Sequence, residues 1–461
     1  MSALNNGLLV LLVLLLAWPV LSSWLRREPV DLFQPSVMFS LFMLLGYVLP
    51  LPSFLNGTDH FTRVWDNTLV VTDRSLAGAL IVVVLATLGF QLGLAGPGAG
   101  ASRRMPTGAD SSHELLLRSR RHLRLLGLLY TFVGLGLFAL GVVLIGGLAV
   151  LLSGLGDRLR LFAGLNYLFG ADSLLLVFAL VWWGHLLLCR RVREKPFWAY
   201  AVFAFLASSL QGNKSTLLVF VLTLTLMYHL LYRRIPASRV LLGAILVFTG
   251  LTIYGLFVRE YLVVGEFVTV DLSGGPREEL YQPLETEIGG NFAQLQMLTL
   301  LVERVPDELP YQYGRTYLSL LTMPVPRWLW PGKPLPSTGI LALAFWPERW
   351  LDEGTTWPPG LIGEMYMNFG AAGVFLGMAL FGWLNARALA SARRNPRHLP
   401  SVTLCALLLA MMPHYLRGEF VAPTTLLAML AIPALFAWRF AFRQHPESRT
   451  LSEAVISQRI R

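Results

Sequence analysis

The sequence predicts an all-α polytopic membrane protein with about eleven transmembrane helices, within a range of about ten to fourteen. Of its 461 residues, 55% are hydrophobic and 14% are charged, whereas soluble globular proteins carry about 25% charged residues. Apolar runs recur along the chain, and with their flanks several reach the roughly 20 residues that a spanning helix needs. Basic residues gather in short connectors between these runs. Together these features argue against a soluble fold.

The expected spans follow the apolar runs in order. They lie at approximately 5–22, 35–52, 75–95, 123–152, 170–189, 197–211, 215–232, 240–260, 370–388, 400–416 and 421–441. The first lacks a preceding basic stretch and a following small-residue cleavage site, so we interpret it as a retained helix. The fourth is long for one crossing, and its end is expected to continue as an interfacial segment. Cys189 and Cys405 lie within or beside apolar runs, as core thiols do, and exclude a disulfide scaffold.

The connectors predict the orientation, because short cytoplasmic loops are enriched in Lys and Arg. Basic groups lie at 103–124, 190–195, 233–239, 387–397 and 439–461. They alternate correctly with the spans if the N-terminus is outside and the C-terminus inside. The expected organisation is therefore eight helices within 1–260, a large outward loop at 261–369, three helices within 370–441 and an inward tail at 442–461.

Loops of this length in a compact protein are usually functional or disordered. We expect this outward loop to be functional and folded, because of its predicted helices and its aromatic residues. Helical stretches are predicted at 291–304 and 317–321. The loop is rich in Trp, Tyr and Pro, and Trp and Tyr favour a membrane surface. We find no internal repeat, so the inverted-repeat signature of many transporters is missing.

Cations on the outward side carry the main functional signal. Positive charge there opposes the usual bias and predicts an anionic partner, since Arg holds two phosphate oxygens at once and keeps its charge. Single residues also have structural explanations, such as snorkelling for Lys214 or a pair between Arg259 and Glu260. The six outward cations are Lys214, Arg259, Arg315, Arg327, Lys333 and Arg417.

Two further groups accompany these cations. His414, Arg417 and Glu419 fall within one short stretch, which predicts either a reactive group or a satisfied hairpin network. Glu364 and Asn368 are four residues apart and share a helical face. Glu364 alone also fits a helix-start carboxylate favoured by the macrodipole. There is no outward Asp-x-Asp cluster, so we expect no metal and no cofactor.

Two segments carry a resemblance to a known family. Residues 311–334 read Tyr-x-Tyr-Gly-Arg-x-Tyr and then Pro-x-Pro-Arg-x-Leu-Trp-Pro-x-Lys-Pro, and residues 363–370 read Gly-Glu-Met-Tyr-Met-Asn-Phe-Gly. Both resemble oligosaccharide repeat-unit polymerases, the Wzy-type O-antigen polymerases. The turns around Lys214 and Arg417 are similar to the family's Arg-bearing turns, although Lys214 replaces the Arg of many members. The resemblance covers most of the chain from about residue 200, and the N-terminal helices match only in character.

The resemblance implies a GT-C-like membrane glycosyltransferase of the bacterial inner membrane with its active site facing the periplasm. Such enzymes join undecaprenyl-pyrophosphate-linked oligosaccharides into O-antigen, capsule or exopolysaccharide. The six outward cations would bind the pyrophosphate. Candidate bases are Glu364, His414 and Glu419, and candidate sugar contacts are Trp330, Tyr313 and Asn368.

The expected partners are the lipid-linked substrates, the bilayer and a chain-length regulator protein, and not nucleic acid. Three alternatives remain open. They are an O-antigen ligase-type glycosyltransferase, a polysaccharide-lipid transporter or flippase, and a structural partner within a polysaccharide assembly.

Overall fold

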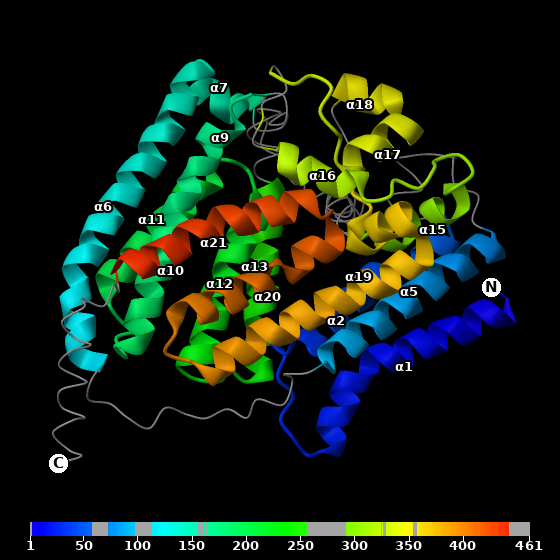
Figure 1. Cartoon of the computed structure of the whole chain (residues 1–461), viewed down its shortest axis with the longest axis horizontal. Helices are drawn as coiled ribbons and strands as arrows, with labels where there is room; N and C mark the ends of the chain where they lie inside the picture. The colour runs from blue at the N-terminus through cyan, green and yellow to red at the C-terminus, as the bar shows by residue number, and fades with distance from the viewer. Residues whose placement is uncertain are drawn as a thin grey trace, which may run out of the picture.

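The fold is built from helices alone in the part of the chain that the structure describes (Figure 1). This computed structural model describes residues 2–57, 72–96, 112–154, 161–162, 164–256, 292–323, 325, 329–353 and 357–441. Within these ranges, 10 helical segments are long and apolar enough to cross a membrane. The predicted all-α, multi-pass class is confirmed at this level.

The candidate spans match the expected runs closely. α11 (Lys195–Ser209) covers the sixth expected span, but its 15 residues rise only about 22 Å, short of the roughly 30 Å hydrocarbon core. The other spans are α1 (Ala3–Leu25), α2–η1–α3 (Pro35–Met43, Leu44–Val48, Leu51–Leu55), α5 (Asp73–Leu94), α6 (Ser112–Leu144), α9–η3–α10 (Asn166–Phe169, Gly170–Asp172, Ser173–Leu188), α12 (Lys214–Leu231), α13 (Ala237–Leu256), α19 (Gly360–Arg394), α20 (Leu399–Arg417) and α21 (Val421–Ala441).

Two boundaries differ from the expected ones for reasons of backbone conformation. The fourth span stops at Leu144, because Gly146 and Gly147 adopt φ values of 106° and 104°, which glycine alone adopts without strain. The short helix α7 (Leu148–Ser153) follows this break. The ninth span is expected from 370, but α19 begins at Gly360 and is kinked at Gly370, where φ is 64°. Helical structure therefore extends back into the predicted outward loop.

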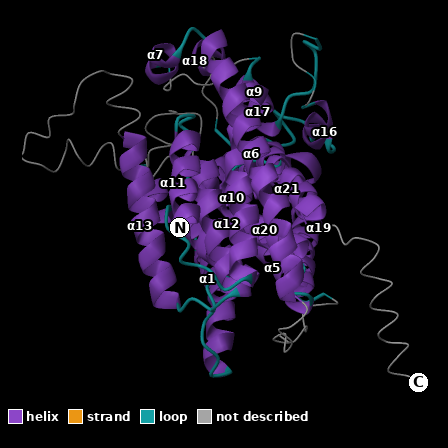
Figure 2. Cartoon of the chain, turned by 90° about the vertical axis from the view of Figure 1, so that its left-hand side faces the viewer, coloured by secondary structure: helices purple, strands orange, loops and turns teal. Residues whose placement is uncertain are grey.

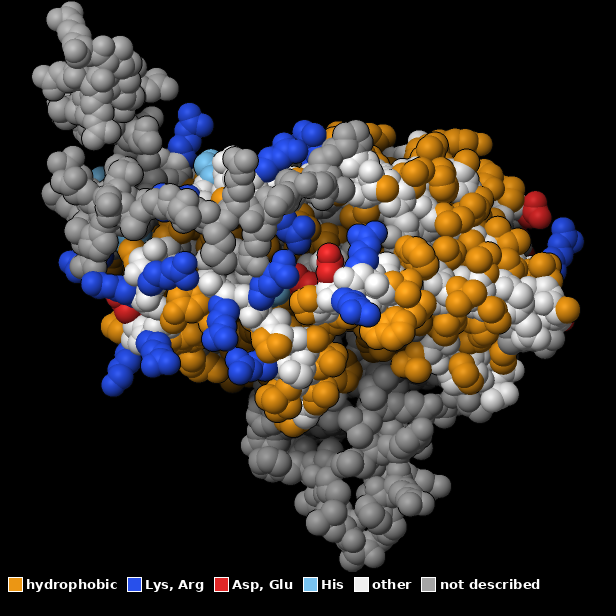
Figure 3. Space-filling view, turned by 90° about the horizontal axis from the view of Figure 1, so that it is seen from below, with side chains coloured by type: hydrophobic (Ala, Val, Ile, Leu, Met, Phe, Trp, Pro, Cys, Tyr) orange, Lys and Arg blue, Asp and Glu red, His pale blue; other side chains and the backbone are white. Residues whose placement is uncertain are grey.

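The two ends of the bundle differ in charge. The connectors at one end, here called the basic end, carry many arginines, and Figure 3 shows Lys and Arg side chains spread over this face. At the other end, here called the capped end, α7 and α16–α18 lie over the bundle (Figures 1 and 2). The described arginines of the basic end include Arg26, Arg27, Arg190, Arg191, Arg193, Arg233, Arg234, Arg393, Arg394 and Arg397.

The outside of the bundle is apolar, as a lipid-facing surface requires. Phe132 and Val143 on α6 are 81% and 71% exposed, and α13 is exposed along most of its length. In water such a surface would drive association. The exposure therefore agrees with helices solvated by lipid.

The crossing of α5 and α19 is the closest helix pair in the core. A Cβ atom added at Gly93 would lie 2.0 Å from the carbonyl oxygen of Ala379, and one at Gly89 would lie 2.4 Å from that of Phe375. On the facing helix, a Cβ at Gly382 would lie 2.3 Å from the Phe90 carbonyl. Small residues allow such approach between membrane helices, where van der Waals packing replaces the hydrophobic effect.

At the basic end, a buried hydrogen bond joins the connector after α1 to α12. His229 Nε2 lies 3.2 Å from Asp31 Oδ2, and the N–H of Ile235 donates to His229 Nδ1 at 3.2 Å. Because Nδ1 accepts a hydrogen bond, the proton on Nε2 faces Asp31. Burial by itself raises the pKa of Asp31, but the hydrogen bond from His229 and the electrostatic interaction with its ring outweigh burial. With smaller contributions from the Phe33 N–H and Arg234, they lower the pKa of Asp31 below its usual value of 3.8.

We expect Gly93→Ala to lower the melting temperature of the detergent-solubilised protein, because its methyl group would overlap the α19 backbone. Overpacking of this kind costs about 1–3 kcal/mol. Gly136→Ala is the matched control, since a Cβ there meets nothing within 4 Å. Equal melting temperatures for both variants would show that α5 and α19 are not held this closely.

We expect Asp31→Asn to destabilise the protein at pH 7 by about 1.5–3 kcal/mol, the range for hydrogen bonds to charged groups. Because the folded-state pKa of Asp31 lies below 3.8, its stabilisation is fully present above the unfolded pKa. It is lost as the pH falls through the folded pKa. The difference in melting temperature between wild type and Asp31→Asn should therefore vanish in acid. The exposed Asp307→Asn is the control, and a pH-independent difference would contradict this assignment.

Candidate functional site

The described residues between α13 and α19, which begin at 292, form part of the capped end and have their own core. α15 (Gln294–Arg304) packs against α5, η1 and α19, and its residues from Gln294 to Leu301 are buried. α16 (Arg315–Thr322), α17 (Ser337–Phe345) and α18 (Pro347–Glu353) follow. One apolar cluster joins α15, α17 and α19, and its members include Met297, Leu341, Trp346, Trp357 and Met367. The predicted helical stretches at 291–304 and 317–321 correspond to α15 and α16.

Asn368 fixes the start of α16 against α19. Its Oδ1 accepts the N–H of Gly314 at 2.8 Å, and its Nδ2 donates to Thr316 Oγ1 and to the Glu364 carbonyl, both at 2.8 Å. The N–H of Tyr313 also donates to the Asn368 carbonyl at 3.1 Å. Asn368 is fully buried, so these bonds satisfy an amide that would be costly to bury alone. Its position makes it a structural link between two segments.

Glu419 links the turn between α20 and α21 to α17. Its Oε2 accepts from Ser337 Oγ at 2.8 Å and from both the N–H and Oγ1 of Thr338 at 3.0 Å. The carboxylate thus lies at the N-terminus of α17, where orphan N–H groups and the helix dipole favour negative charge. Glu419 is 6% exposed. Its hydrogen bonds indicate a positioning role.

Glu364 is the less satisfied of the two carboxylates. It is fully buried, and its Oε2 accepts the N–H of Phe420 at 2.5 Å. Its Oε1 is buried without a well-formed hydrogen bond, and the negative charge of Glu419 lies near enough to repel it. A buried, unpartnered carboxylate oxygen is expensive, and such groups occur more often at functional sites. We call Thr316, Ser337, Thr338, Glu364, Asn368 and Glu419 the carboxylate cluster.

Aromatic rings cover one side of the carboxylate cluster. The ring of Tyr317 lies 5.1 Å from that of Phe420 in an edge-to-face arrangement and 6.5 Å from that of Phe369. Burial, with a smaller contribution from the charge of Glu364, raises the pKa of Tyr317 well above its usual value. Tyr317 therefore stays a neutral phenol beside the carboxylates.

Two of the predicted cations lie close in sequence to the Tyr317–Phe420 aromatic pair. Arg315 is the first residue of α16, two positions before Tyr317, and Arg417 is the last residue of α20, three positions before Phe420. Both are exposed. Because the Tyr317 and Phe420 rings are in contact, the two arginines emerge close to the same aromatic pair. Arg417 also interacts electrostatically with the half-buried His414.

Of the other predicted site residues, Tyr313 is hydrogen-bonded to the carboxylate cluster through its backbone N–H, and the rest have no contact with the cluster among the described hydrogen bonds or lie outside the described residues. Lys333 donates from Nζ to the Val325 carbonyl at 2.9 Å, and Trp330 is 47% exposed. Tyr313 is 76% exposed, with a left-handed φ of 46°. Arg259 and Arg327 lie outside the described residues.

Lys214 begins α12 in the compact turn that its sequence predicts. Gly212 has a φ of 69°, and the Asn213 side chain accepts the N–H of Ser215 at 3.2 Å. The turn is joined to its neighbours through Gln211, which donates to the Phe169 carbonyl, and through Ser209, whose carbonyl accepts from Tyr254. These bonds place Lys214 at the capped end, on the α9 and α13 side of the bundle.

Sequence reasoning missed the hydroxyl residues of the carboxylate cluster. Thr316, Ser337 and Thr338 each hold a predicted site residue. A weak signal existed for Ser337 and Thr338, which directly follow Pro336 at a helix start. Among the described residues, no three His, Cys, Asp or Glu side chains are placed to hold a metal ion. Independence from metal remains a prediction.

The comparisons give one partial match. Residues 197–394 match the family model of a domain of unknown function, DUF8712. This stretch is less than half of the chain; it contains Glu364, Asn368, Thr316, Ser337 and Thr338 but ends before Arg417 and Glu419. No curated protein and no solved structure matches the chain.

We expect Asn368→Asp to destabilise the capped end. Aspartate can still accept the Gly314 N–H, but it cannot donate to Thr316 or to the Glu364 carbonyl, and it adds charge beside Glu364. A cost of about 1–3 kcal/mol for each unmet buried group is expected, measured as a lower melting temperature. Asn6→Asp, at an exposed position in α1, is the control. A melting temperature like that of wild type would refute the bridging role of Asn368.

Proposed function

We propose that this protein is a membrane glycosyltransferase that joins oligosaccharide units carried on a lipid pyrophosphate. The observation that carries the proposal is Glu364, a fully buried carboxylate at the capped end whose Oε1 accepts no well-formed hydrogen bond, although the Thr316 and Ser337 hydroxyl groups are near it. Arg315 and Arg417 are exposed near the Tyr317–Phe420 aromatic pair, at the end opposite the basic connectors. The resemblance at 311–334 and 363–370 supplies the class of substrate. The positive-inside bias supports a capped end that faces the periplasm.

Glu364 is the best candidate for the general base. A base must have a free lone pair within reach of the acceptor hydroxyl. Glu364 retains such an oxygen, whereas Glu419 accepts three hydrogen bonds on Oε2 and anchors α17. His414 lies on the spanning helix α20, three residues before the cation Arg417. The three candidates from the sequence are thus ranked, with Glu364 first.

Arg417 and Arg315 are the best candidates for pyrophosphate binding. Both are exposed at the capped end, where a lipid-linked donor would meet them in the proposed reaction. Guanidinium groups hold phosphate oxygens in a bidentate manner and neutralise charge as a phosphate leaves. Lys214 and Lys333 lie at the same end and would assist as point charges. Trp330 and Tyr313 expose aromatic faces suited to sugar rings.

The proposed reaction is one direct displacement. The acceptor sugar's hydroxyl oxygen forms a bond to the donor's anomeric carbon, while the bond from that carbon to the pyrophosphate oxygen breaks. The hydroxyl proton passes to Glu364, and the lipid pyrophosphate leaves with both electrons of the broken bond. A single displacement inverts the anomeric centre. The polysaccharide then remains on the acceptor's lipid carrier.

The described charges favour an enzyme over a transporter with an anion path. Such a path would need cations deep within several spans, and no Lys or Arg is buried among the described residues. A ligase-type enzyme would use the same donor with a different acceptor. It differs from a polymerase in its product, because only a polymerase makes a ladder on the lipid carrier.

The test is elongation of purified lipid-linked repeat units by the full chain in lipid nanodiscs. Glu364→Gln should lower the rate by about 10²–10⁴-fold, the usual contribution of a general base. Arg417→Ala should lower it by about 10²–10³-fold. Arg193→Ala, an exposed change at the basic end, should leave the rate unchanged, as should a chelator.

Each variant's melting temperature separates loss of fold from loss of chemistry. Full elongation by a folded Glu364→Gln enzyme would overturn its role as base. Transfer of one preformed chain to a different lipid acceptor, without a ladder, would instead identify a ligase.

A further inference from the structure

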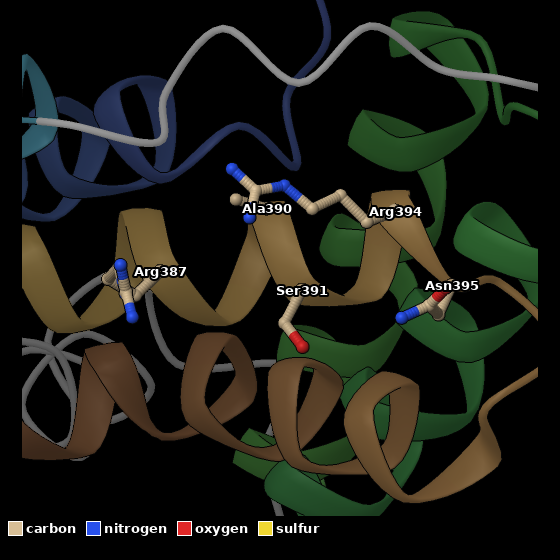
Figure 4. Close-up of a pocket in the computed structure, with 5 residues that line it drawn as sticks. All are labelled: Arg387, Ala390, Ser391, Arg394 and Asn395. Carbon is tan, nitrogen blue, oxygen red and sulfur yellow. The ribbon is translucent and has the colours of Figure 1, made fainter.

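The basic end holds a cavity that the proposed reaction does not use. It has a volume of about 210 Å³ and is lined by Arg387, Ala390, Ser391, Arg394 and Asn395 near the end of α19. Figure 4 shows the Arg394 side chain running back along the helix over Ala390, toward Arg387. A water molecule occupies about 30 Å³ of liquid, so the cavity has room for a phosphodiester group. Two guanidinium groups therefore border a space of suitable size for an anion.

The two arginines lack an acidic counterpart in the described part of the chain. No ion pair there involves Arg387 or Arg394. The Arg387 guanidinium lies 5.5 Å from the centre of the Trp383 ring, a cation–π contact that holds it near the helix. Ser391 Oγ lies 3.3 Å from Ser401 Oγ on α20, which fixes the cavity against the neighbouring helix. Two like charges held side by side favour a bound anion.

An apolar stripe leads along α19 directly into this cavity. Leu376, Leu380, Trp383 and Leu384 are 66%, 56%, 38% and 45% exposed. Spacings of three, four, seven and eight residues place them on the helical face that continues into Arg387, Ser391 and Arg394. From Leu376 to Leu384 the helix rises about 12 Å. One face thus presents a hydrocarbon-like surface followed by an arginine cavity.

This order of chemistry matches a phospholipid rather than a soluble anion. Acyl chains fit against the leucines, a tryptophan lies at the level where aromatic belts meet headgroups, and the phosphate level coincides with the arginines. A free phosphate ion would contact the cavity only, and the adjoining apolar stripe would take no part in binding it. The leaflet at the basic end is also the one whose anionic lipids attract basic segments.

We propose that the cavity between Arg387 and Arg394 binds the headgroup phosphate of an anionic phospholipid, whose acyl chains lie along Leu376, Leu380 and Leu384. The site is separate from the carboxylate cluster, which lies at the opposite end of α19. It therefore stands whether or not the proposed transferase activity is correct. The ligand is a resident membrane lipid and not a substrate.

The test is native mass spectrometry of the full chain with phosphatidylglycerol or phosphatidylcholine of identical acyl chains. Wild type should retain phosphatidylglycerol in preference. The double variant Arg387→Gln/Arg394→Gln should weaken phosphatidylglycerol binding by about tenfold or more, given the contribution of each interfacial cation, and leave phosphatidylcholine unchanged. The control Arg193→Gln/Arg233→Gln removes the same charge from exposed positions at the basic end and should retain phosphatidylglycerol within about twofold.

Three results would overturn the proposal. Equal loss of phosphatidylglycerol in both double variants would show a diffuse charge effect instead of a site. Equal retention of the two lipids by wild type would show that the cavity does not recognise the anionic headgroup. Competition by glycerol 3-phosphate as strong as that by phosphatidylglycerol would indicate a site for soluble phosphates. Unchanged melting temperatures confirm that the exposed substitutions leave the fold intact.

Discussion

The close crossing of α5 and α19 is the constraint on which the rest of the structure depends. Gly89, Gly93 and Gly382 let the two backbones approach until no methyl group would fit between them. Lipid supplies no hydrophobic force between helices, so this approach must be stabilised by packing. It fixes α19, and α19 carries Glu364 and Asn368 near one end and Arg387 and Arg394 near the other. Both candidate sites therefore take their positions from one helix.

The kink at Gly370 explains how a single helix serves the capped end as well as the membrane. A φ of 64° interrupts the helix there, and a Cβ at this position would lie 3.1 Å from Tyr311 Oη. The segment before the kink turns its polar face toward α16 and the Glu419 turn, where Asn368 and Glu364 meet backbone N–H groups. The segment after it packs against α5. Gly370 thus divides α19 into a first segment that contributes to the carboxylate cluster and a second segment that crosses the membrane.

Hydropathy predicted the helices well, because lipid requires every spanning backbone to satisfy its own hydrogen bonds. The grouping of Glu364 with Asn368 was also predictable, since it depends only on helical spacing. The hydroxyl partners were not, because Ser337 reaches Glu419 across 82 positions of sequence and Asn368 reaches Thr316 across 52. Nor could the sequence show that α15 is buried, since Gln294, Gln296 and Thr299 give it a polar character. Tertiary contacts decide these features, and periodicity does not report them.

Arginines lie near both ends of α19, and the residues around them differ between the two ends. At the capped end, Arg315 and Arg417 lie close in sequence to the Tyr317–Phe420 ring pair, and the Phe420 N–H donates to the buried Glu364. In the proposed site, an anion held by these arginines is therefore near a group able to take a proton. At the basic end, Arg387 and Arg394 adjoin an apolar stripe and no described carboxylate, so an anion bound there meets only charge and hydrocarbon. The residues at the capped end could therefore support a proton transfer, whereas those at the basic end could only hold a bound anion. The function of an arginine in this fold therefore follows from the acidic and apolar groups around it.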